Sequence, residues 1–127
     1  ETARITLLTR SSVEVSKAMF VSRIEAIFRM AGFEPRAENN YVGWEPLADN
    51  AIVKLCDDTH LELFGKRAKI AAVHAGLECG VIGAIYPGIE MVSFGPTIRG
   101  AHTPEEHVNV PTVGTFWRLL TEVLRRV

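Results

Sequence analysis

The sequence has too few cysteines for a disulfide framework, and it lacks the common short motifs of metal and nucleotide sites. Cys56 and Cys79 form no Cys-x-x-Cys pair, and neither a Gly-rich phosphate loop nor a His-Glu-x-x-His occurs in the 127 residues. Two isolated thiols indicate reduced cysteines of a cytoplasmic protein, with a single Cys56–Cys79 disulfide as the alternative. Nothing here predicts a nucleotide site or a metal site built from one short motif.

The sequence also lacks an excess of one charge and a long apolar run. It has 14 basic and 15 acidic residues, so we expect neither a nucleic-acid partner nor an anionic-membrane partner. No apolar stretch approaches the ~20 residues that span a bilayer, and the start lacks the basic-then-apolar pattern of a signal peptide. Because it begins at Glu1 instead of Met, we expect an internal piece of a longer protein.

The first third of the sequence predicts a β-α-β unit. Residues 5–9 are β-branched and apolar, which is typical of a strand. An apolar stripe predicts a helix over 13–31, and Gly32 is placed to end it. A second strand is expected over 33–41, and the segment 42–46 then breaks the pattern as a hinge or linker.

The remaining sequence alternates helices with short apolar strands. Gly65 is placed to end the first of these helices, and Thr112 is the expected N-cap of the last. Continuous apolar strands between helices indicate an α/β sheet covered on both faces, of which this chain holds a part. The expected elements are helices over 47–64, 76–85 and from 112 onward, and strands over 69–74 and 89–94.

Polar side chains follow two of the predicted strands. His74, Glu78 and Cys79 surround a strand-to-helix turn, and His102 lies in the Gly/Pro-rich loop after residues 89–94. In a parallel sheet both strand ends meet at one edge, so these side chains are expected to face one cleft. Backbone N–H groups at a helix start also favour an anion or a thiolate.

Each of these residues also has a structural interpretation. A lone loop histidine such as His102 is more often a surface residue than a ligand. Glu78 in a first helical turn can simply complement the helix dipole, and Cys79 can be a small buried hydrophobe. Glu105 and Glu106 are most simply part of a hydrated loop. Two other functions therefore stay open: a thiol hydrolase that uses Cys79 with His74, and a non-catalytic association module.

Two long stretches carry a family resemblance. Residues 74–80 (HAGLECG) and 91–106 (MVSFGPTIRGAHTPEE), followed by Val108-Asn109-Val110, closely resemble the C-terminal end of aminoacyl-histidine dipeptidases. These Xaa-His enzymes form the peptidase D branch of the M20 dizinc metallopeptidases. The resemblance runs across nearly the whole chain. Another M20 exopeptidase or an aminoacylase is the alternative within the family.

The resemblance implies a two-domain parent protein. Its catalytic domain is an α/β/α sandwich, interrupted by a lid domain with a ferredoxin-like fold. Residues 1–42 then correspond to part of the lid, which in this family often mediates dimers. Residues 43–127 correspond to the C-terminal part of the catalytic metallopeptidase domain. A dipeptide substrate and a homodimer formed through the lid are the partners that the resemblance implies.

The family motif also implies roles for single residues. His102 matches the zinc ligand of the Gly-Pro-x-x-x-Gly-x-His loop, and neutral imidazole is a good zinc donor. Arg10 matches the arginine that binds the substrate's C-terminal carboxylate, for which a guanidinium fork is suited. His74, Gly76 and Glu78 fall in the substrate-contact region, and Glu78 suits a substrate ammonium group.

Most of the catalytic residues that the family uses have no counterpart in this sequence. The family's other zinc ligands and its glutamate general base have no counterpart in the 127 residues, so no catalytic residue is expected in this chain. Two zinc ions per site are implied for the parent enzyme, with cobalt or manganese as substitutes. We therefore expect the chain alone to be inactive.

Overall fold

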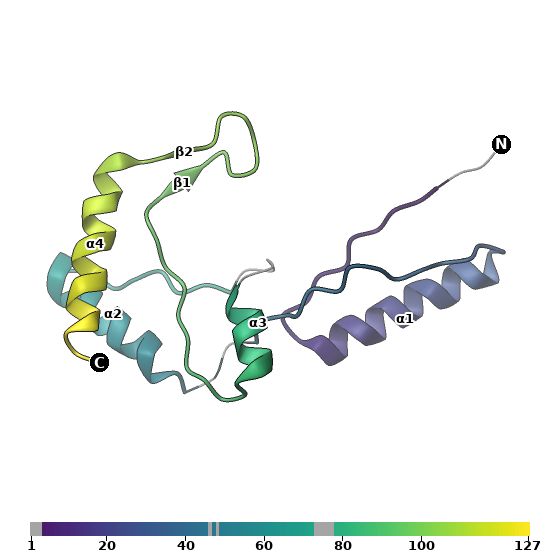
Figure 1. Ribbon diagram of the computed structural model, residues 1–127, viewed down its shortest axis with the longest axis horizontal. Coiled ribbons are helices and arrows are strands. Elements are labelled where there is room, and N and C mark those ends of the chain that lie inside the picture. The colour runs from purple at the N-terminus through teal and green to yellow at the C-terminus, as the bar shows by residue number, and fades with distance from the viewer. Residues whose placement is uncertain (1–3, 46, 48, 73–77) are drawn as a thin grey trace. The chain divides into compact units, whose positions relative to one another are not determined.

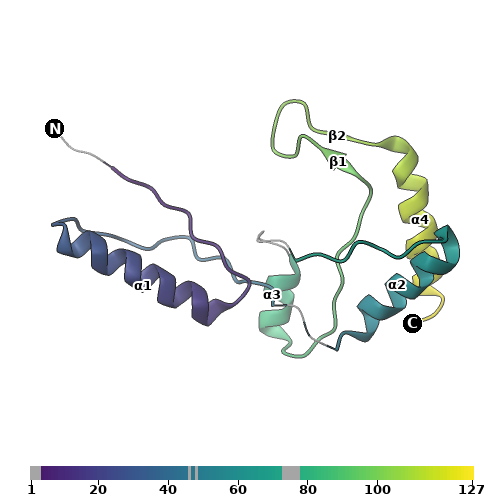
Figure 2. The same ribbon diagram turned by 180° about the vertical axis from the view of Figure 1, so that it is seen from behind.

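The computed structural model describes residues 4–45, 47, 49–72 and 78–127. These residues form four helices and one two-stranded sheet, so the chain mixes α and β structure as predicted. The chain divides into two compact units. Unit 1 comprises Glu1–Leu47 and Ala71–Ile89, and unit 2 comprises Ala48–Ile70 and Glu90–Val127. Figure 1 and its reverse view, Figure 2, show the elements within each unit.

Unit 1 contains helices α1 (Glu14–Met30) and α3 (Glu78–Ile85). The predicted end of α1 is confirmed, because Gly32 has a φ of 83°, a left-handed conformation that costs glycine little. The predicted end of α3 at residue 85 is also confirmed: the Tyr86 N–H bonds the carbonyl of Ile82 just after the helix, and Gly88 has a φ of 87°.

The strands predicted in unit 1 are absent from the described residues. Residues 5–9 have no partner strand there, and an extended segment without a ladder is not a strand. Residues 33–41 are interrupted twice, because Pro35 has no N–H to donate and Asn39 has a φ of 56°. Both segments therefore run as irregular extended chain.

A buried lysine connects α1 to the segment that follows it. Lys17 is only 7% exposed, and its Nζ donates to Glu14 Oε1 at 2.6 Å and to the carbonyl of Tyr41. Glu14 Oε1 also accepts the N–H of Gly43 at 2.5 Å. The Lys17 hydrogen bond, helped by the Gly43 N–H, holds the pKa of the Glu14 carboxyl below its usual range. A buried ammonium ion is tolerated here because it is paired and hydrogen-bonded.

Two glycines permit close backbone crossings in unit 1. A Cβ on Gly43 would lie 2.5 Å from the carbonyl oxygen of Ser11 and 2.6 Å from that of Ser12. A Cβ on Gly80 would lie 2.7 Å from the carbonyl oxygen of Val42. The segment predicted as a hinge thus passes between two other segments of its own unit, at a spacing that no larger residue allows.

Unit 2 is organised around helix α2 (Ala51–Phe64), which packs on helix α4 (Val110–Leu124). The N-terminus of α2 lies later than predicted, because Asn50 is the N-cap: its side chain accepts the N–H of Val53 at 3.1 Å. Asn50 also donates to the carbonyl of Met91 at 2.9 Å, and Glu90 accepts the N–H of Ala51. The predicted end at Gly65 is confirmed by a φ of 69°.

The strand predicted over residues 89–94 is absent, and part of this segment contacts α2 instead. The polar groups of Glu90 and Met91 bind the first turn of α2, and residues 89–94 have no strand assignment. The predicted strand over 69–74 is likewise absent up to residue 72, and its last two residues lie outside the described part of the chain. Pro46, the last residue of the predicted hinge segment, also lies outside the described residues.

The core of unit 2 lies between α2 and α4. Cys56, Leu119 and Val123 are buried there, and Ile52, Leu55 and Leu63 of α2 pack against them. On α4, Leu119 is buried in this core, whereas the larger Trp117 is 61% exposed. Thr59 on α2 is fully buried, and its hydroxyl has no hydrogen-bond partner among the described residues. Both cysteines are free thiols, as predicted.

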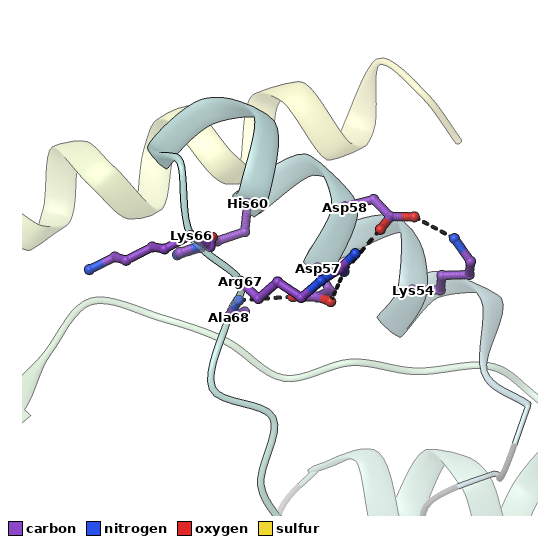
Figure 3. A network of polar contacts seen from close by, with 7 residues as sticks. All are labelled: Lys54, Asp57, Asp58, His60, Lys66, Arg67 and Ala68. Carbon is purple, nitrogen blue, oxygen red and sulfur yellow. Dashed lines mark hydrogen bonds and ion pairs between the residues drawn. The ribbon is translucent and has the colours of Figure 1, made fainter.

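An ion-pair network fixes the turn that follows α2 (Figure 3). Arg67 Nη1 pairs with Asp57 Oδ2 and, at 3.1 Å, with Asp58 Oδ1. Asp57 also accepts the N–H of Ala68 at 2.8 Å, and Lys54 pairs with Asp58. Arg67 lowers the pKa of the Asp57 carboxyl, helped by the Ala68 N–H; Lys54 and then Arg67 lower that of Asp58. The network therefore holds residues 67–68 against α2.

Replacing Gly43 with alanine should destabilise the chain by about 1–3 kcal/mol, because the new methyl group would overlap backbone oxygens that have little freedom to move. Gly114→Ala is the matched control: Gly114 lies exposed within α4 with nothing near its Cβ position, so it should stabilise by up to about 1 kcal/mol. Urea unfolding followed by circular dichroism measures both. Equal effects of the two substitutions would contradict the close crossing.

The network of Figure 3 should make stability depend on acid pH. The folded-state pKa values of Asp57 and Asp58 are lowered from 3.8. Below 3.8 the unfolded chain therefore binds more protons, and stability is lost as the pH falls through the lowered values. Arg67→Gln should reduce the stability lost between pH 7 and acid pH. Lys66→Gln removes the same charge from the neighbouring exposed residue. If both variants lose as much stability on acidification as the unmodified chain, Arg67 is not the cause.

Candidate functional site

The loop that carries His102 is the turn of an antiparallel hairpin in unit 2. Strand β1 (Ile98–Arg99) pairs with strand β2 (His107–Val108), with Ile98 opposite Val108 and Arg99 opposite His107. At the base of the hairpin, the N–H of Asn109 donates to the carbonyl of Thr97 at 2.8 Å. Residues 100–106 are thus held at both ends by paired backbone. The sheet was not predicted: strands of two residues have no detectable alternation.

Hydrogen bonds inside the loop fold it back on itself. The N–H and the hydroxyl of Thr103 both donate to the carbonyl of Gly100, at 3.0 and 2.8 Å. The N–H of Glu106 donates in turn to the carbonyl of Thr103 at 3.0 Å. Gly100 has a φ of 63°, and a Cβ there would lie 3.2 Å from the carbonyl oxygen of Glu105, so glycine is favoured at this turn.

His102 lies at the exposed end of this loop. Its backbone has a φ of 67°, a left-handed conformation that is uncommon for a residue with a side chain. Its N–H donates to Glu106 Oε2 at 2.8 Å, and its side chain is exposed to solvent. The imidazole is thus presented outward on a hydrogen-bonded loop, which is a suitable arrangement for a ligand supplied to a metal.

His107, the other histidine of the hairpin, is placed differently. Its Nδ1 lies 2.7 Å from the carbonyl oxygen of Glu105, so the ring is held by its own loop. His60 in α2 is held in a similar way, with Nδ1 at 2.7 Å from the carbonyl oxygen of Lys66 (Figure 3). Both contacts are local to the backbone. These two histidines therefore provide natural comparisons for His102.

The described residues supply one candidate metal donor and no complete metal site. No three His, Cys, Asp or Glu side chains lie close enough together there to hold an ion. An exposed imidazole fits the role of a single ligand whose co-ligands come from other polypeptide, because zinc needs about four donors. Within the described residues, no helix is both long and apolar enough to cross a membrane.

The predicted substrate-binding residues belong to unit 1. Arg10 is exposed on the extended segment before α1, and Glu78 is exposed as the first residue of α3. Cys79 beside it is half-buried. His74 and Gly76 lie outside the described residues. His102, in contrast, belongs to unit 2.

A groove of about 270 Å³ in unit 2 was not predicted from the sequence. The residues that line it include aromatic and aliphatic ones, three threonines, a histidine and a lysine. No short motif could have revealed it, since its walls come from three separate stretches of chain. Its lining residues are His60, Ala68, Lys69, Phe94, Gly95, Thr97, Thr112, Thr115, Phe116 and Leu119.

Thr112 connects the hairpin to α4, and its predicted role as the N-cap is wrong. The helix begins at Val110 with Asn109 as the N-cap, because Pro111 has the backbone φ that a first helical turn requires. The hydroxyl of Thr112 instead accepts the N–H of Thr97 at 2.9 Å and donates to the carbonyl of Asn109 at 2.6 Å. This side chain therefore fixes where β1 leaves the helix.

Thr112→Val should destabilise the chain by about 0.5–1.5 kcal/mol, because valine keeps the shape but removes both hydrogen bonds. Thr115→Val, on an exposed position of the same helix, is the matched control and should change stability by less than about 0.5 kcal/mol. Denaturant unfolding measures stability, and amide hydrogen exchange of Thr97 reports the bond. Unchanged exchange at Thr97 in the valine variant would contradict the assignment.

Comparison with known proteins places these features in a family context. No family model matches the chain. It is 41% identical over 120 residues to the cytosol non-specific dipeptidase of Escherichia coli (strain K12). The alignment covers 94% of this chain and 25% of the relative, so the chain spans about a quarter of that protein's length. Similarity at this level along almost the whole chain supports the M20 dipeptidase resemblance found in its motifs.

Proposed function

We propose that this chain is part of a longer metal-dependent dipeptidase that cleaves dipeptides with a C-terminal histidine. The observation that carries the proposal is the 41% identity to a dipeptidase over 94% of the chain. Zinc dependence and the preference for Xaa-His substrates rest on the family resemblance of residues 74–80 and 91–106. The two isolated thiols and the name of the relative, a cytosol dipeptidase, support a cytoplasmic location. The family resemblance supports a homodimer formed through residues 1–42.

In this proposal His102 coordinates zinc through one imidazole nitrogen. A bound zinc ion supplies Lewis acidity and lowers the pKa of a water molecule in its shell. The support from the structure is the exposed imidazole on a loop closed by its own hydrogen bonds. Because one imidazole is far from a full ligand set, the chain alone would neither retain two zinc ions nor hydrolyse a dipeptide.

Arg10, Glu78, His74 and Gly76 would recognise the substrate. A guanidinium group forms a two-point contact with a planar carboxylate, which suits Arg10 to the C-terminal end of a dipeptide. Glu78 carries the opposite charge and suits the ammonium end. Both described side chains are exposed, as contact with a substrate requires.

A second candidate function is a dipeptidase with a broad substrate range. The relative is named a non-specific dipeptidase, and this chain is similar to a quarter of it. The two candidates share the proposed metal chemistry and differ in how the C-terminal side chain is selected. Rates for a set of dipeptides that differ only in that residue separate them: a strong preference for histidine favours the first candidate, and similar rates favour the second.

His102→Ala in the full-length protein should abolish zinc-dependent hydrolysis of Xaa-His dipeptides and reduce zinc content. We expect kcat/KM to fall more than the roughly 10–100-fold typical of residues that only support a ligand. Metal analysis and kinetics measure the two effects. His107→Ala is the matched control, because its ring nitrogen lies against the Glu105 carbonyl of the same hairpin, and it should stay within a few-fold of the unmodified enzyme.

Three outcomes would contradict parts of the proposal. Full activity and full zinc content in the His102→Ala protein would remove the metal role of this residue. Loss of activity in Cys79→Ser, with rapid alkylation of Cys79 near neutral pH, would favour the thiol hydrolase instead. Robust turnover by the 127-residue chain alone would show that it already holds a complete active site.

A further inference from the structure

We propose that Glu106 is a positioning residue that holds His102 in the conformation in which it meets the metal. This inference rests on the proposed function, since it concerns the same imidazole. It also assigns a role to a side chain that the sequence suggests is merely hydrated. Glu106 touches neither substrate nor metal in this proposal and acts only through His102.

The need for such a residue follows from the backbone of His102. A φ of 67° places His102 in the left-handed region, which residues with a Cβ rarely occupy unless nearby contacts hold them there. The direction of the Cα–Cβ bond depends on this conformation. If His102 relaxed to an extended conformation, its imidazole would leave the loop in a different direction.

Glu106 supplies the holding contact directly. Its Oε2 accepts the N–H of His102 at 2.8 Å, a bond to an ionised acceptor that is stronger than a neutral one. Its own N–H donates to the carbonyl of Thr103 at 3.0 Å, so the residue closes the loop with both backbone and side chain. Thr103 is in turn bound to Gly100 through its N–H and hydroxyl. Gly100, Thr103 and Glu106 together fix the backbone on either side of His102.

Glu105, the residue before Glu106, provides a matched control within the same loop. Glu105 enters the loop through its backbone: its N–H donates to Thr103 Oγ1 at 3.3 Å, and its carbonyl oxygen contacts His107 Nδ1 at 2.7 Å. Shortening its side chain leaves both contacts in place. Glu105→Ala therefore removes the same charge from the same loop without removing the bond to His102.

The test compares Glu106→Ala, Glu106→Gln, Glu106→Asp and Glu105→Ala in the full-length protein. Zinc affinity is measured by competition with a chromophoric chelator, and the His102 amide is followed by NMR after 15N-histidine labelling. Glu106→Ala should weaken zinc binding about 10–100-fold, the usual effect of losing a residue that orients a ligand. Its His102 amide proton should shift upfield as the hydrogen bond is lost.

The other variants identify the cause. Glu106→Gln should restore zinc affinity to within a few-fold, because an amide oxygen accepts the same N–H. Glu106→Asp keeps the negative charge but shortens the side chain, so its oxygen no longer reaches the His102 N–H. Zinc affinity should then fall as it does in Glu106→Ala. This variant keeps the test decisive if Glu106→Ala folds poorly. Glu105→Ala should leave affinity and the amide shift unchanged.

Three results would overturn the inference: unchanged zinc affinity in Glu106→Ala and Glu106→Asp, a Gln variant as weak as the Ala variant, or an effect of Glu105→Ala as large as that of Glu106→Ala. The proposed function fails separately, if His102→Ala retains its zinc. A protein in which His102→Ala loses zinc and Glu106→Ala does not refutes the positioning role alone.

Discussion

Unit 2 depends on one packing contact, that of α2 against α4. Three buried side chains, Cys56, Leu119 and Val123, meet there, and the contact is reinforced at its edges by the Arg126–Glu62 ion pair and by Arg118 over the ring of Phe64. Hydrogen bonds at the start of each of these two helices connect the pair to the rest of unit 2. The Asn50 cap connects the start of α2 to residues 90–91, and Thr112 connects the start of α4 to the hairpin. The loop that presents His102 is therefore anchored, through β1 and Thr97, to the second helix of this pair.

The sequence predicted the helices well because their signals are local. Gly32 and Gly65 were placed correctly as helix ends, since a left-handed residue after the last turn is a property of a few neighbouring positions. The errors at Asn50 and Thr112 have a common reason. Several Asn, Asp, Ser and Thr residues stand near each helix start, and which of them caps it depends on contacts with segments far along the chain.

The strands were predicted poorly because a strand is defined by its partner. Residues 5–9 and 89–94 have suitable composition, yet composition does not say which backbone groups lie opposite. In the structure, Glu90 and Met91 bind the first turn of α2 instead. The hairpin β1–β2 shows the reverse case: its strands are too short to have a pattern, and they form because Thr97 and Asn109 are brought together at the base of the loop.

In the candidate site, too, the features that depend on neighbouring residues could be predicted and those that depend on the folded loop could not. The motif around His102 predicted a metal ligand at this position, but not the left-handed backbone of His102 or the Glu106 carboxylate that accepts its N–H, because both are properties of a folded loop. On an extended strand, a glutamate four residues from a histidine is too far away for its carboxylate to accept the histidine N–H. Only when Gly100 and Thr103 reverse the chain does Glu106 return to the N–H of His102. The position of the His102 side chain is therefore determined less by His102 itself than by the residues that close the loop around it.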